Sequence, residues 1–276
     1  MRTELVSIPT DTVALDGAFY TPEDAPVRGG VLLMHGNTMN FYTGAPRFLP
    51  PHLTALGYAC LAYNRRGHDI LTIRNSRAAE GAAFQTAAEG IADNECAARD
   101  LAGRGFAEPI VIGHSNGGML AAQFAAAHPE TRALVLLSAH GGGRDSVALG
   151  CRRGHLAQGR LEETVATAER LVAEGNGRAL MLLPGWWYVL SAESFLDRVH
   201  NTPDTLAAAP HITCPVLYVR GDREDPAVYP AEEFARLCGG PCEVAIVEHC
   251  DHFYNGREDA VARTVVEWLG RTLGAL

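Results

Sequence analysis

The sequence predicts an α/β fold built on a mostly parallel sheet of about eight strands. Short apolar runs rich in valine, isoleucine and leucine alternate with alanine-rich stretches of helical periodicity, and glycine or proline marks each junction. Most of the apolar runs are continuous rather than alternating, which is typical of parallel strands covered on both faces. With 276 residues, 47% of them hydrophobic, the chain is long enough to bury one large core.

The first two strands are of a different kind from the rest. The N-terminal segments "ELVSIP" and "DTVALDGAFY" alternate polar and apolar residues, which predicts an antiparallel pair. The continuous apolar runs follow in the order "GGVLLMHG", "YACLAYN", "PIVIGHS", "ALVLLSA", "PVLYVRG" and "EVAIVEH". Together these segments account for the expected sheet.

Helices are expected between or after these strands. The segments with helical periodicity are Arg47 to Gly57, Thr86 to Gly103, Gly117 to His128, Ala231 to Leu237 and Glu258 to Leu273. Each follows a predicted strand, so it serves as a crossover to the next strand or as the closing helix of the chain.

The interval between the sixth and seventh strands breaks this rhythm. It runs from Ala139 to Cys214, far longer than an ordinary connection. It contains a helical pattern in "LEETVATAERLVAEG" and an aromatic cluster in "PGWWYVLSAESF". We therefore expect a helical cap of residues 141–210, inserted after the sixth strand into a core of residues 1–140 and 211–276.

Composition and charge exclude several classes of partner. The formal net charge is −9, and no lysine- or arginine-rich run offers a surface for nucleic acid or anionic membranes. We find neither an N-terminal apolar leader nor a membrane-spanning segment. Seven cysteines without regular spacing favour free thiols, and hence a cytoplasmic protein. A small-molecule substrate is the expected partner, while no feature predicts an oligomeric state.

The stretch "PIVIGHSNGGML" holds the first candidate catalytic residue. Its strand-like and helix-like halves meet at Ser115, which Gly113 and Gly117 flank in a G-x-S-x-G pattern. A sharp turn between strand and helix strains the serine backbone, and glycines let the neighbouring chains pass closely. The turn also places the serine oxygen at a helix N-terminus, where developing negative charge is stabilised. Ser115 is therefore the expected nucleophile.

A serine nucleophile needs a base, and the base needs an acid that orients it. In this geometry the acid and then the histidine follow the serine along the chain. The last strand leads into "CDHFYNGRED", where we prefer His252 to His249 because the loop beyond the strand reaches over the sheet edge. His252 is the expected general base.

The acid is less well defined. Asp222, Glu224 and Asp225 all follow the seventh strand within four positions. The turn after a strand presents the acid a few residues beyond its terminal glycine, which favours Glu224 and Asp225. Asp225 is preferred because aspartate is shorter and stiffer, and because the Asp-Pro pair starts a turn. Glu224 is the second choice and Asp222 the third.

Taken together, these motifs resemble the α/β-hydrolase fold superfamily along nearly the whole chain. The matching segments are "LLMHGNTMN", "NRRGHD", "GHSNGG", "RGDRED" and "CDHF". In that family the residues after the His-Gly pair and after the nucleophile supply the backbone N–H groups that bind the oxyanion. The resemblance assigns these roles to Asn37 and Asn116, with Thr38 as an alternative first donor. It implies a serine hydrolase and leaves the substrate open.

Other polar residues are expected to be structural. Arg65, Arg66 and His68 are best explained by a salt-bridged turn, with contact to an anionic substrate group as the alternative. His35 and His114 accompany their motifs, and His140 is expected in a loop, with a place at the border of the pocket as the alternative. Cysteine and histidine spacing near the C-terminus matches no zinc pattern, and no nucleotide-binding motif is present, so no metal or cofactor is expected.

The cap bears on substrate choice. Trp186, Trp187, Tyr188 and Phe195 form an apolar lid over the serine if they do not pack within the cap, and they predict a small or medium-sized, apolar or aromatic substrate. We therefore expect a carboxylic-ester hydrolase that works through an acyl-enzyme. The alternatives are cleavage of a C–C bond, thioester or lactone by the same residues, and a receptor-like protein that only holds a ligand.

Overall fold

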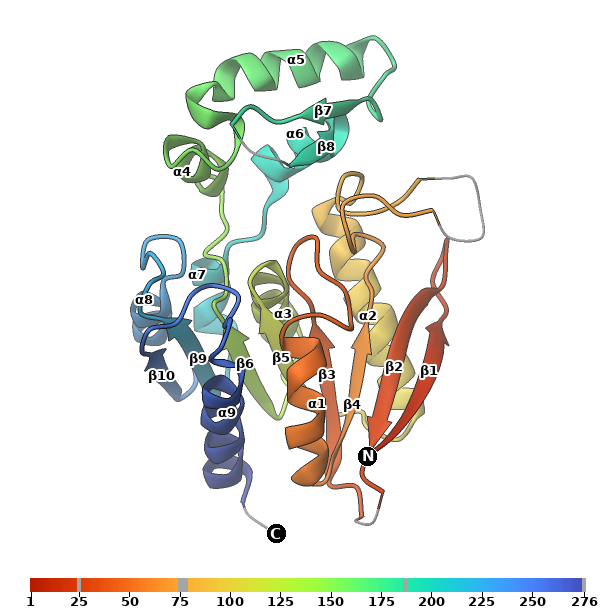
Figure 1. Ribbon diagram of the computed structural model, residues 1–276, viewed down its shortest axis with the longest axis vertical. Coiled ribbons are helices and arrows are strands. Elements are labelled where there is room, and N and C mark those ends of the chain that lie inside the picture. Colours follow the sequence, from red (N-terminus) through yellow and green to blue (C-terminus); the bar gives the residue numbers. More distant parts are fainter. Residues whose placement is uncertain (24–25, 74–78, 186–187, 275–276) are drawn as a thin grey trace.

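The computed structural model describes residues 1–23, 26–73, 79–185 and 188–274. An eight-stranded sheet forms its centre, in the order β1-β2-β4-β3-β5-β6-β9-β10 (Figure 1). Its strands are β1 (Arg2–Ile8), β2 (Leu15–Thr21), β3 (Gly29–Met34), β4 (Tyr58–Tyr63), β5 (Ile110–His114), β6 (Ala133–Leu137), β9 (Val216–Gly221) and β10 (Cys242–Val247). The predicted α/β fold and the mostly parallel sheet are confirmed.

The strand directions follow the hydrophobic pattern of the sequence. β2 pairs antiparallel with both β1 and β4, whereas every other pairing in the sheet is parallel. The parallel strands β3 to β6 and β9 are buried almost throughout, as expected for strands covered on both faces. β1 is largely exposed, which fits its alternating sequence at the sheet edge.

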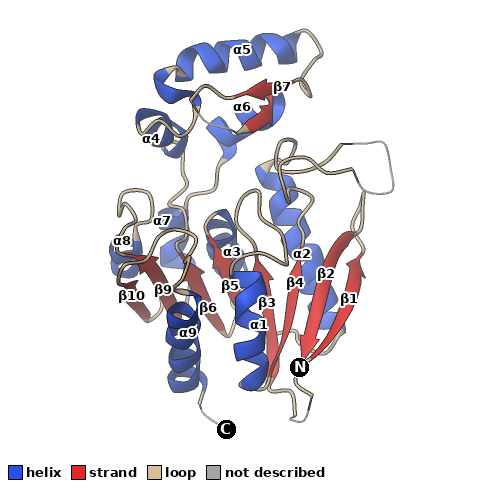
Figure 2. Ribbon diagram, viewed as in Figure 1, coloured by secondary structure: helices blue, strands red, loops and turns tan. Residues whose placement is uncertain are grey.

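Helices cover both faces of the sheet (Figure 2). They are α1 (Ala45–Ala55), α2 (Ala87–Gly103), α3 (Asn116–Ala127), α7 (Thr205–Ala208), α8 (Ala231–Leu237) and α9 (Glu258–Leu273), with a 3₁₀ turn η2 (Ala209–His211). Helix α1 begins earlier than expected because Pro46 fits the first turn. Helix α2 begins after Thr86, which forms a reciprocal capping box with Glu89.

The sheet separates two hydrophobic clusters. One lies between the sheet and α2, α3, α7, η2 and α8, and includes Leu32, Leu134 and Phe234. The other lies between the sheet and α1 and α9, and includes Leu49 and Trp268. Because helices cover both faces of the sheet, a ligand site is expected at the edge where the parallel strands end.

The cap stands above that edge of the sheet (Figure 1). It consists of α4 (Ser146–Arg152), the 3₁₀ turn η1 (Ala157–Gly159), α5 (Leu161–Ala173), the antiparallel pair β7 (Leu180–Leu182) and β8 (Val189–Ser191), and α6 (Ala192–Asn201). A small cluster of its own, including Tyr188, Leu190 and Phe195, packs α5, the β7–β8 pair and α6 together. The pairing of β7 with β8 is a feature that the helical periodicity of this segment does not predict.

Within the described part of the chain, no helix combines the length and the apolar character that crossing a bilayer requires. All seven cysteines are free thiols, and most of them are buried.

Candidate active site

Ser115 lies in a strained turn between β5 and α3. Its backbone angles are φ 57° and ψ −119°, in the left-handed half of the map that residues with a Cβ rarely adopt. A Cβ on Gly113 would lie 2.3 Å from the carbonyl oxygen of Gly117, and a Cβ on Gly117 would lie 2.4 Å from that of His35. The flanking glycines are therefore required by close packing of the chain around the serine.

The side chains of Ser115 and His252 meet above the end of the sheet. The two atoms that the reaction requires, Oγ of Ser115 and Nε2 of His252, are 3.0 Å apart. His252 comes from the loop between β10 and α9, 137 residues further along the chain. His249, the alternative candidate, is exposed.

Glu224 orients the imidazole of His252. Its Oε1 accepts a hydrogen bond from Nδ1 of His252 at 2.7 Å. Its Oε2 accepts from the backbone N–H of Gly221 at 2.7 Å and from the hydroxyl of Ser138 at 2.5 Å. The Glu224 side chain is only 2% exposed. A carboxylate held by three donors in this way has one orientation, and so has the ring bound to it.

Asp225, the preferred acid of the sequence analysis, makes different contacts, and this preference is corrected. Its Oδ1 accepts from the backbone N–H of Ala227 at 2.8 Å, and its other oxygen pairs with Arg153 of the cap. Its side chain is 43% exposed. The Asp-Pro turn that favoured Asp225 is the reason, because an aspartate before proline bonds its own backbone two residues on.

Asp222, the third candidate, anchors the histidine loop. It accepts hydrogen bonds from the backbone N–H groups of His249 at 2.9 Å and of Cys250 at 3.0 Å. These two hydrogen bonds are the main reason that the pKa of the Asp222 carboxyl lies below its ordinary value. The three acids of this turn thus have different partners: Glu224 contacts His252, Asp225 contacts the cap, and Asp222 contacts the loop that carries His252.

Two aromatic rings pack against the imidazole of His252. The ring of Tyr229 stacks on it at 4.7 Å between centroids, and that of His114 lies at 5.0 Å. Nε2 of His114 also bonds the backbone carbonyl of His252 at 2.9 Å. Burial is the main cause that lowers the pKa of His114 to about 3, and the electrostatic effect of the neighbouring His252 adds to it. His114 is thus a neutral support for the His252 loop, in line with its expected structural place.

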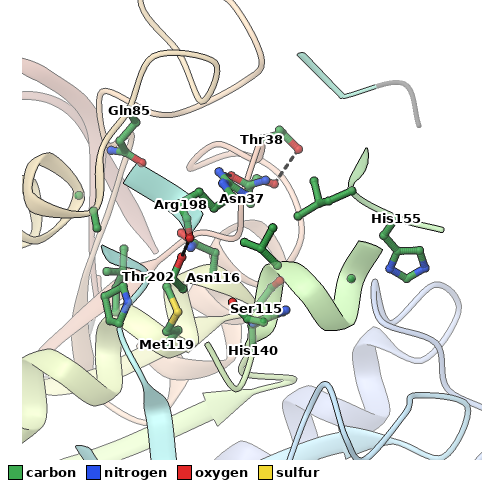
Figure 3. Close-up of a pocket in the computed structure, with 18 of the residues that line it drawn as sticks. Asn37, Thr38, Gln85, Ser115, Asn116, Met119, His140, His155, Arg198 and Thr202 are labelled. Carbon is green, nitrogen blue, oxygen red and sulfur yellow. Dashed lines mark hydrogen bonds between the residues drawn. The ribbon is translucent and has the colours of Figure 1, made fainter. Parts of the chain in front are cut away.

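Asn37 and Asn116 both line the cavity in front of Ser115 (Figure 3). Asn116 is the first residue of α3, so its backbone N–H is among those that a helix leaves without an internal partner. Neither its N–H nor that of Asn37 meets an acceptor among the described residues. Thr38, the alternative donor, has a positive φ of 57° and lines the same cavity.

The cavity itself has a volume of about 400 Å³ and lies between the sheet edge and the cap. Aliphatic side chains supply much of its wall, namely Met119 and Leu120 of α3, Val147 and Leu149 of α4, and Leu156. Tyr229 and Phe253 add aromatic surface beside His252. A small or medium-sized organic molecule fits such a space.

The aromatic cluster of the cap does not contribute to this wall where the structure describes it. Tyr188 and Phe195 are fully buried within the cap's own cluster. The hydroxyl of Tyr188 nevertheless accepts a hydrogen bond from the side chain of Asn37 at 2.6 Å. Trp186 and Trp187, the candidate substrate-binding residues, lie outside the described residues.

The turn after β4 contains ion pairs and hydrogen bonds, as expected for a salt-bridged turn. Arg66 forms an ion pair with the buried Asp93 at 2.7 Å, and His68 bonds Asp69 at 2.8 Å. Arg65 is 1% exposed and donates to the carbonyl of His35 at 2.7 Å. None of these three basic residues lines the main cavity.

Sequence reasoning missed several polar residues of the cavity. Arg198 and Gln85 reach it from α6 and from the turn before α2, and His140 borders it after β6. Burial and the nearby charge of Arg198 lower the pKa of His140 to about 4. Of these three residues, only His140 had a signal in the sequence, because it lies three residues beyond the end of β6. In the described ranges, no group of three histidine, cysteine or acidic side chains is arranged to hold a metal ion.

Comparisons with known proteins agree with this architecture. A family model described as "Alpha/beta hydrolase family" matches residues 31–264. The fold is similar to that of Est1E from Butyrivibrio proteoclasticus with ferulic acid bound, at 19% identity and TM-score 0.72 over 97% of this chain and 99% of that one. It is also similar to the α/β hydrolase GrgF from Penicillium sp. sh18, at 13% identity and TM-score 0.74 over 99% of both chains.

A third similar structure is a soluble variant of monoglyceride lipase from Saccharomyces cerevisiae, solved with a substrate analogue. The identity is 17% and the TM-score 0.68, over 99% of this chain and 95% of that one. No curated protein matches the sequence. At these identities the likeness to solved structures concerns the fold, whereas the family match covers most of the chain.

Proposed function

The chain belongs to the α/β hydrolase family, and we propose that it is a serine hydrolase that cleaves carboxylic esters without a cofactor. One observation carries the proposal. Ser115, His252 and Glu224 form a continuous hydrogen-bonded chain, with 3.0 Å between Ser115 Oγ and His252 Nε2 and 2.7 Å between His252 Nδ1 and Glu224 Oε1. This is the arrangement that nucleophilic catalysis by serine requires.

Acylation begins when the hydroxyl oxygen of Ser115 attacks the ester carbonyl. Nε2 of His252 takes the hydroxyl proton, and Glu224 stabilises the resulting imidazolium through Nδ1. The carbonyl oxygen becomes an oxyanion, which the backbone N–H groups of Asn37 and Asn116 bind. His252 then returns its proton to the leaving alcohol as the ester C–O bond breaks, which leaves the acyl group on Ser115.

Deacylation repeats these steps with water. His252 takes a proton from water, whose oxygen attacks the acyl carbonyl, and the same two N–H groups bind the second oxyanion. The imidazolium then protonates Ser115 Oγ as the acid product leaves. A single oxyanion donor is worth on the order of 10²- to 10³-fold in rate. The arrangement of Asn37 and Asn116 is thus a large part of the proposed catalysis.

The proposed substrate is a small or medium-sized ester with an apolar part. A cavity of about 400 Å³ with aliphatic walls from α3 and α4 supports this size and character. The same residues are chemically able to open a lactone or a thioester. Ester cleavage is the first reaction to test because it makes the fewest demands on the site.

An alkyl fluorophosphonate tests the proposal, since it reacts with an activated serine. We expect one label per chain on the native protein and no label on Ser115→Ala, together with turnover of 4-nitrophenyl esters that the same substitution abolishes. Ser146→Ala is a matched control, because Ser146 lines the cavity but its hydroxyl bonds the carbonyl of Gly143 instead of His252. It should still take up the label.

Two results would overturn the proposal. Native protein that neither takes up the label nor turns over any ester does not have an activated serine. Tight retention of a ligand without turnover would instead identify a receptor-like protein that keeps the fold and the hydrogen-bonded chain but not the reaction.

A further inference from the structure

Arg198 is a permanent positive charge on the wall of the cavity. It lies on α6 of the cap and lines the same space as Ser115. Figure 3 shows it beside Asn37, in front of the nucleophile. In the described ranges of the chain, the polar partners of its guanidinium are neutral oxygens. The charge therefore faces the cavity without a carboxylate to balance it.

The donors of this guanidinium are only partly used. Nη2 donates to the hydroxyl of Tyr188 at 3.1 Å and, at 3.4 Å, to the side-chain oxygen of Asn37. The guanidinium also lies over the Tyr188 ring, 5.3 Å from its centroid. An arginine side chain has five N–H donors, and neither Nε nor Nη1 has a partner among the described residues. These contacts fix the group in place and leave donors available to a ligand.

The neighbouring acid does not neutralise this charge. Asp197 also lines the cavity, but its Oδ2 accepts from the backbone N–H of Ala87 at 2.6 Å and its Oδ1 from the side chain of Asn201 at 2.8 Å. Its charge is thus directed to the first turn of α2, where the helix dipole favours an anion.

A second donor in the cavity has no acceptor. The side-chain nitrogen Nε2 of Gln85 is buried and makes no hydrogen bond with the described residues. A buried donor without a partner is unfavourable. Because this nitrogen is buried, the donors that a ligand in the cavity can reach are those of Arg198.

We propose that the substrate of this site carries a carboxylate, which Arg198 binds, in addition to the ester that Ser115 attacks. The inference rests on the proposed ester hydrolysis and narrows its substrate class to esters of anionic character. A planar guanidinium can donate two parallel hydrogen bonds to the two oxygens of a carboxylate. A neutral ester has no such negatively charged pair of oxygens. Arg198 is then a specificity-determining residue, and the apolar wall receives the carbon chain between the two groups.

The experiment compares paired substrates that differ in one charge. The anionic set is the mono-4-nitrophenyl esters of adipate, pimelate and suberate, whose carboxylates are too far from the ester to attack it efficiently. The neutral set is 4-nitrophenyl hexanoate, heptanoate and octanoate, with the same carbon counts. The quantity measured is the ratio of kcat/KM between the two members of each pair, for the native protein and for Arg198→Gln.

We expect the native protein to prefer at least one anionic ester, and Arg198→Gln to lower the ratio for it by about 10- to 100-fold, mainly through KM, as for a lost charge-assisted hydrogen bond. Arg198→Lys should retain part of the preference, since it keeps the charge without the planar fork. The control is Arg153→Gln, because Arg153 lies in the cap outside the cavity wall and pairs with Asp225. This control should leave the ratio unchanged.

Equal losses on both members of each pair would overturn the proposal, because Arg198 would then only position Asn37. An unchanged ratio in Arg198→Gln would also overturn it. Calorimetric binding of monomethyl adipate and dimethyl adipate to Ser115→Ala separates this question from catalysis. Preferential binding of the anion that disappears in Ser115→Ala/Arg198→Gln supports the carboxylate site even if no ester is turned over. Turnover of neutral esters alone supports the proposed function and contradicts the inference.

Discussion

The sheet edge and the cap meet at one cavity, yet they are built in different ways. At the sheet edge, Glu224 accepts three hydrogen bonds from groups on or just after β6, β9 and β10, and a strained backbone presents Ser115. In the cap, Arg198 is held by two hydrogen bonds to neutral partners, at 3.1 Å to Tyr188 and 3.4 Å to Asn37. The sheet edge thus holds Ser115, His252 and Glu224 in one hydrogen-bonded arrangement, whereas the cap keeps donors of Arg198 available for the carboxylate that we propose.

The two adjacent acids give the sharpest test of this comparison. Glu224→Gln should lower kcat by about 10³- to 10⁴-fold, because an amide no longer holds the productive tautomer of His252. Asp225→Asn should change kcat less than about threefold, since it loses only a partly exposed ion pair with the cap. Steady-state kinetics on one 4-nitrophenyl ester measures both. The opposite order would return the role to Asp225.

Two helical glycines, Gly117 in α3 and Gly150 in α4, test how tightly each region is packed. Gly117→Ala in α3 should destabilise the protein by about 3 kcal/mol, because its Cβ would lie 2.4 Å from two carbonyl oxygens. Gly150→Ala in α4 should be neutral or stabilise it by up to about 1 kcal/mol, because its Cβ would lie 3.7 Å from Leu156. Denaturant unfolding measures both changes. Equal losses would show that the cap is packed as tightly as the sheet edge.

A third test uses pH, because the sheet edge buries a neutral histidine. His114 has a pKa of about 3 in the folded protein and an ordinary value of 6.5 when unfolded. The unfolded chain therefore binds the extra proton, and stability falls as pH drops below about 6.5 and continues to fall towards 3. His114→Gln should reduce this slope by about 1.4 kcal/mol per pH unit.

The cap offers the matched control for this pH effect. His200 is exposed on α6, so its side chain is in water in both the folded and the unfolded states. His200→Gln should therefore follow the native profile when urea unfolding is measured between pH 4 and 7. If both variants had the same slope as the native protein, His114 would not contribute to the pH dependence.

The smallest expected effect concerns the contact between the two regions. Tyr188→Phe removes the hydroxyl that accepts from the side chains of Asn37 and Arg198. A lost hydrogen bond of this kind corresponds to roughly a 3- to 10-fold decrease in kcat/KM. The thermal midpoint, measured in parallel, separates this effect from a general loss of stability. Unchanged kinetics would mean that the cap does not help to position Asn37.

The sequence predicted the sheet edge better than the cap, for a physical reason. Ser115 and its glycines are required by local steric constraints, and His252 follows from chain order, so both are placed by short-range information. The choice between Glu224 and Asp225 depends on how a turn folds back against Ser138 and Gly221, which no local pattern encodes. Aspartate is the shorter and stiffer acid, but the carboxylate of Asp225 accepts a hydrogen bond from the backbone of its own turn instead of from His252.

The cap was predicted only as an insertion of helices. Its periodic segment corresponds to α5, whereas the short pairing of β7 with β8 has no strong alternation to reveal it. Arg198 was missed because an arginine on an amphipathic helix is normally solvated. Its place in the cavity depends on how α6 packs across the end of the sheet, and this packing is a tertiary property.

The route by which the chain enters and leaves the cap has a consequence for how such proteins diversify. Gly142 and Asp204 face each other in an isolated antiparallel bridge, and the backbone N–H of Gly143 bonds the carbonyl of Pro203 at 2.8 Å. The two ends of the insertion are therefore hydrogen-bonded to each other at the base of the cap. A segment of another length closes across the same short gap at little entropic cost. The cap, which supplies part of the cavity wall, can therefore change in length without a change at the sheet edge that holds Ser115, His252 and Glu224.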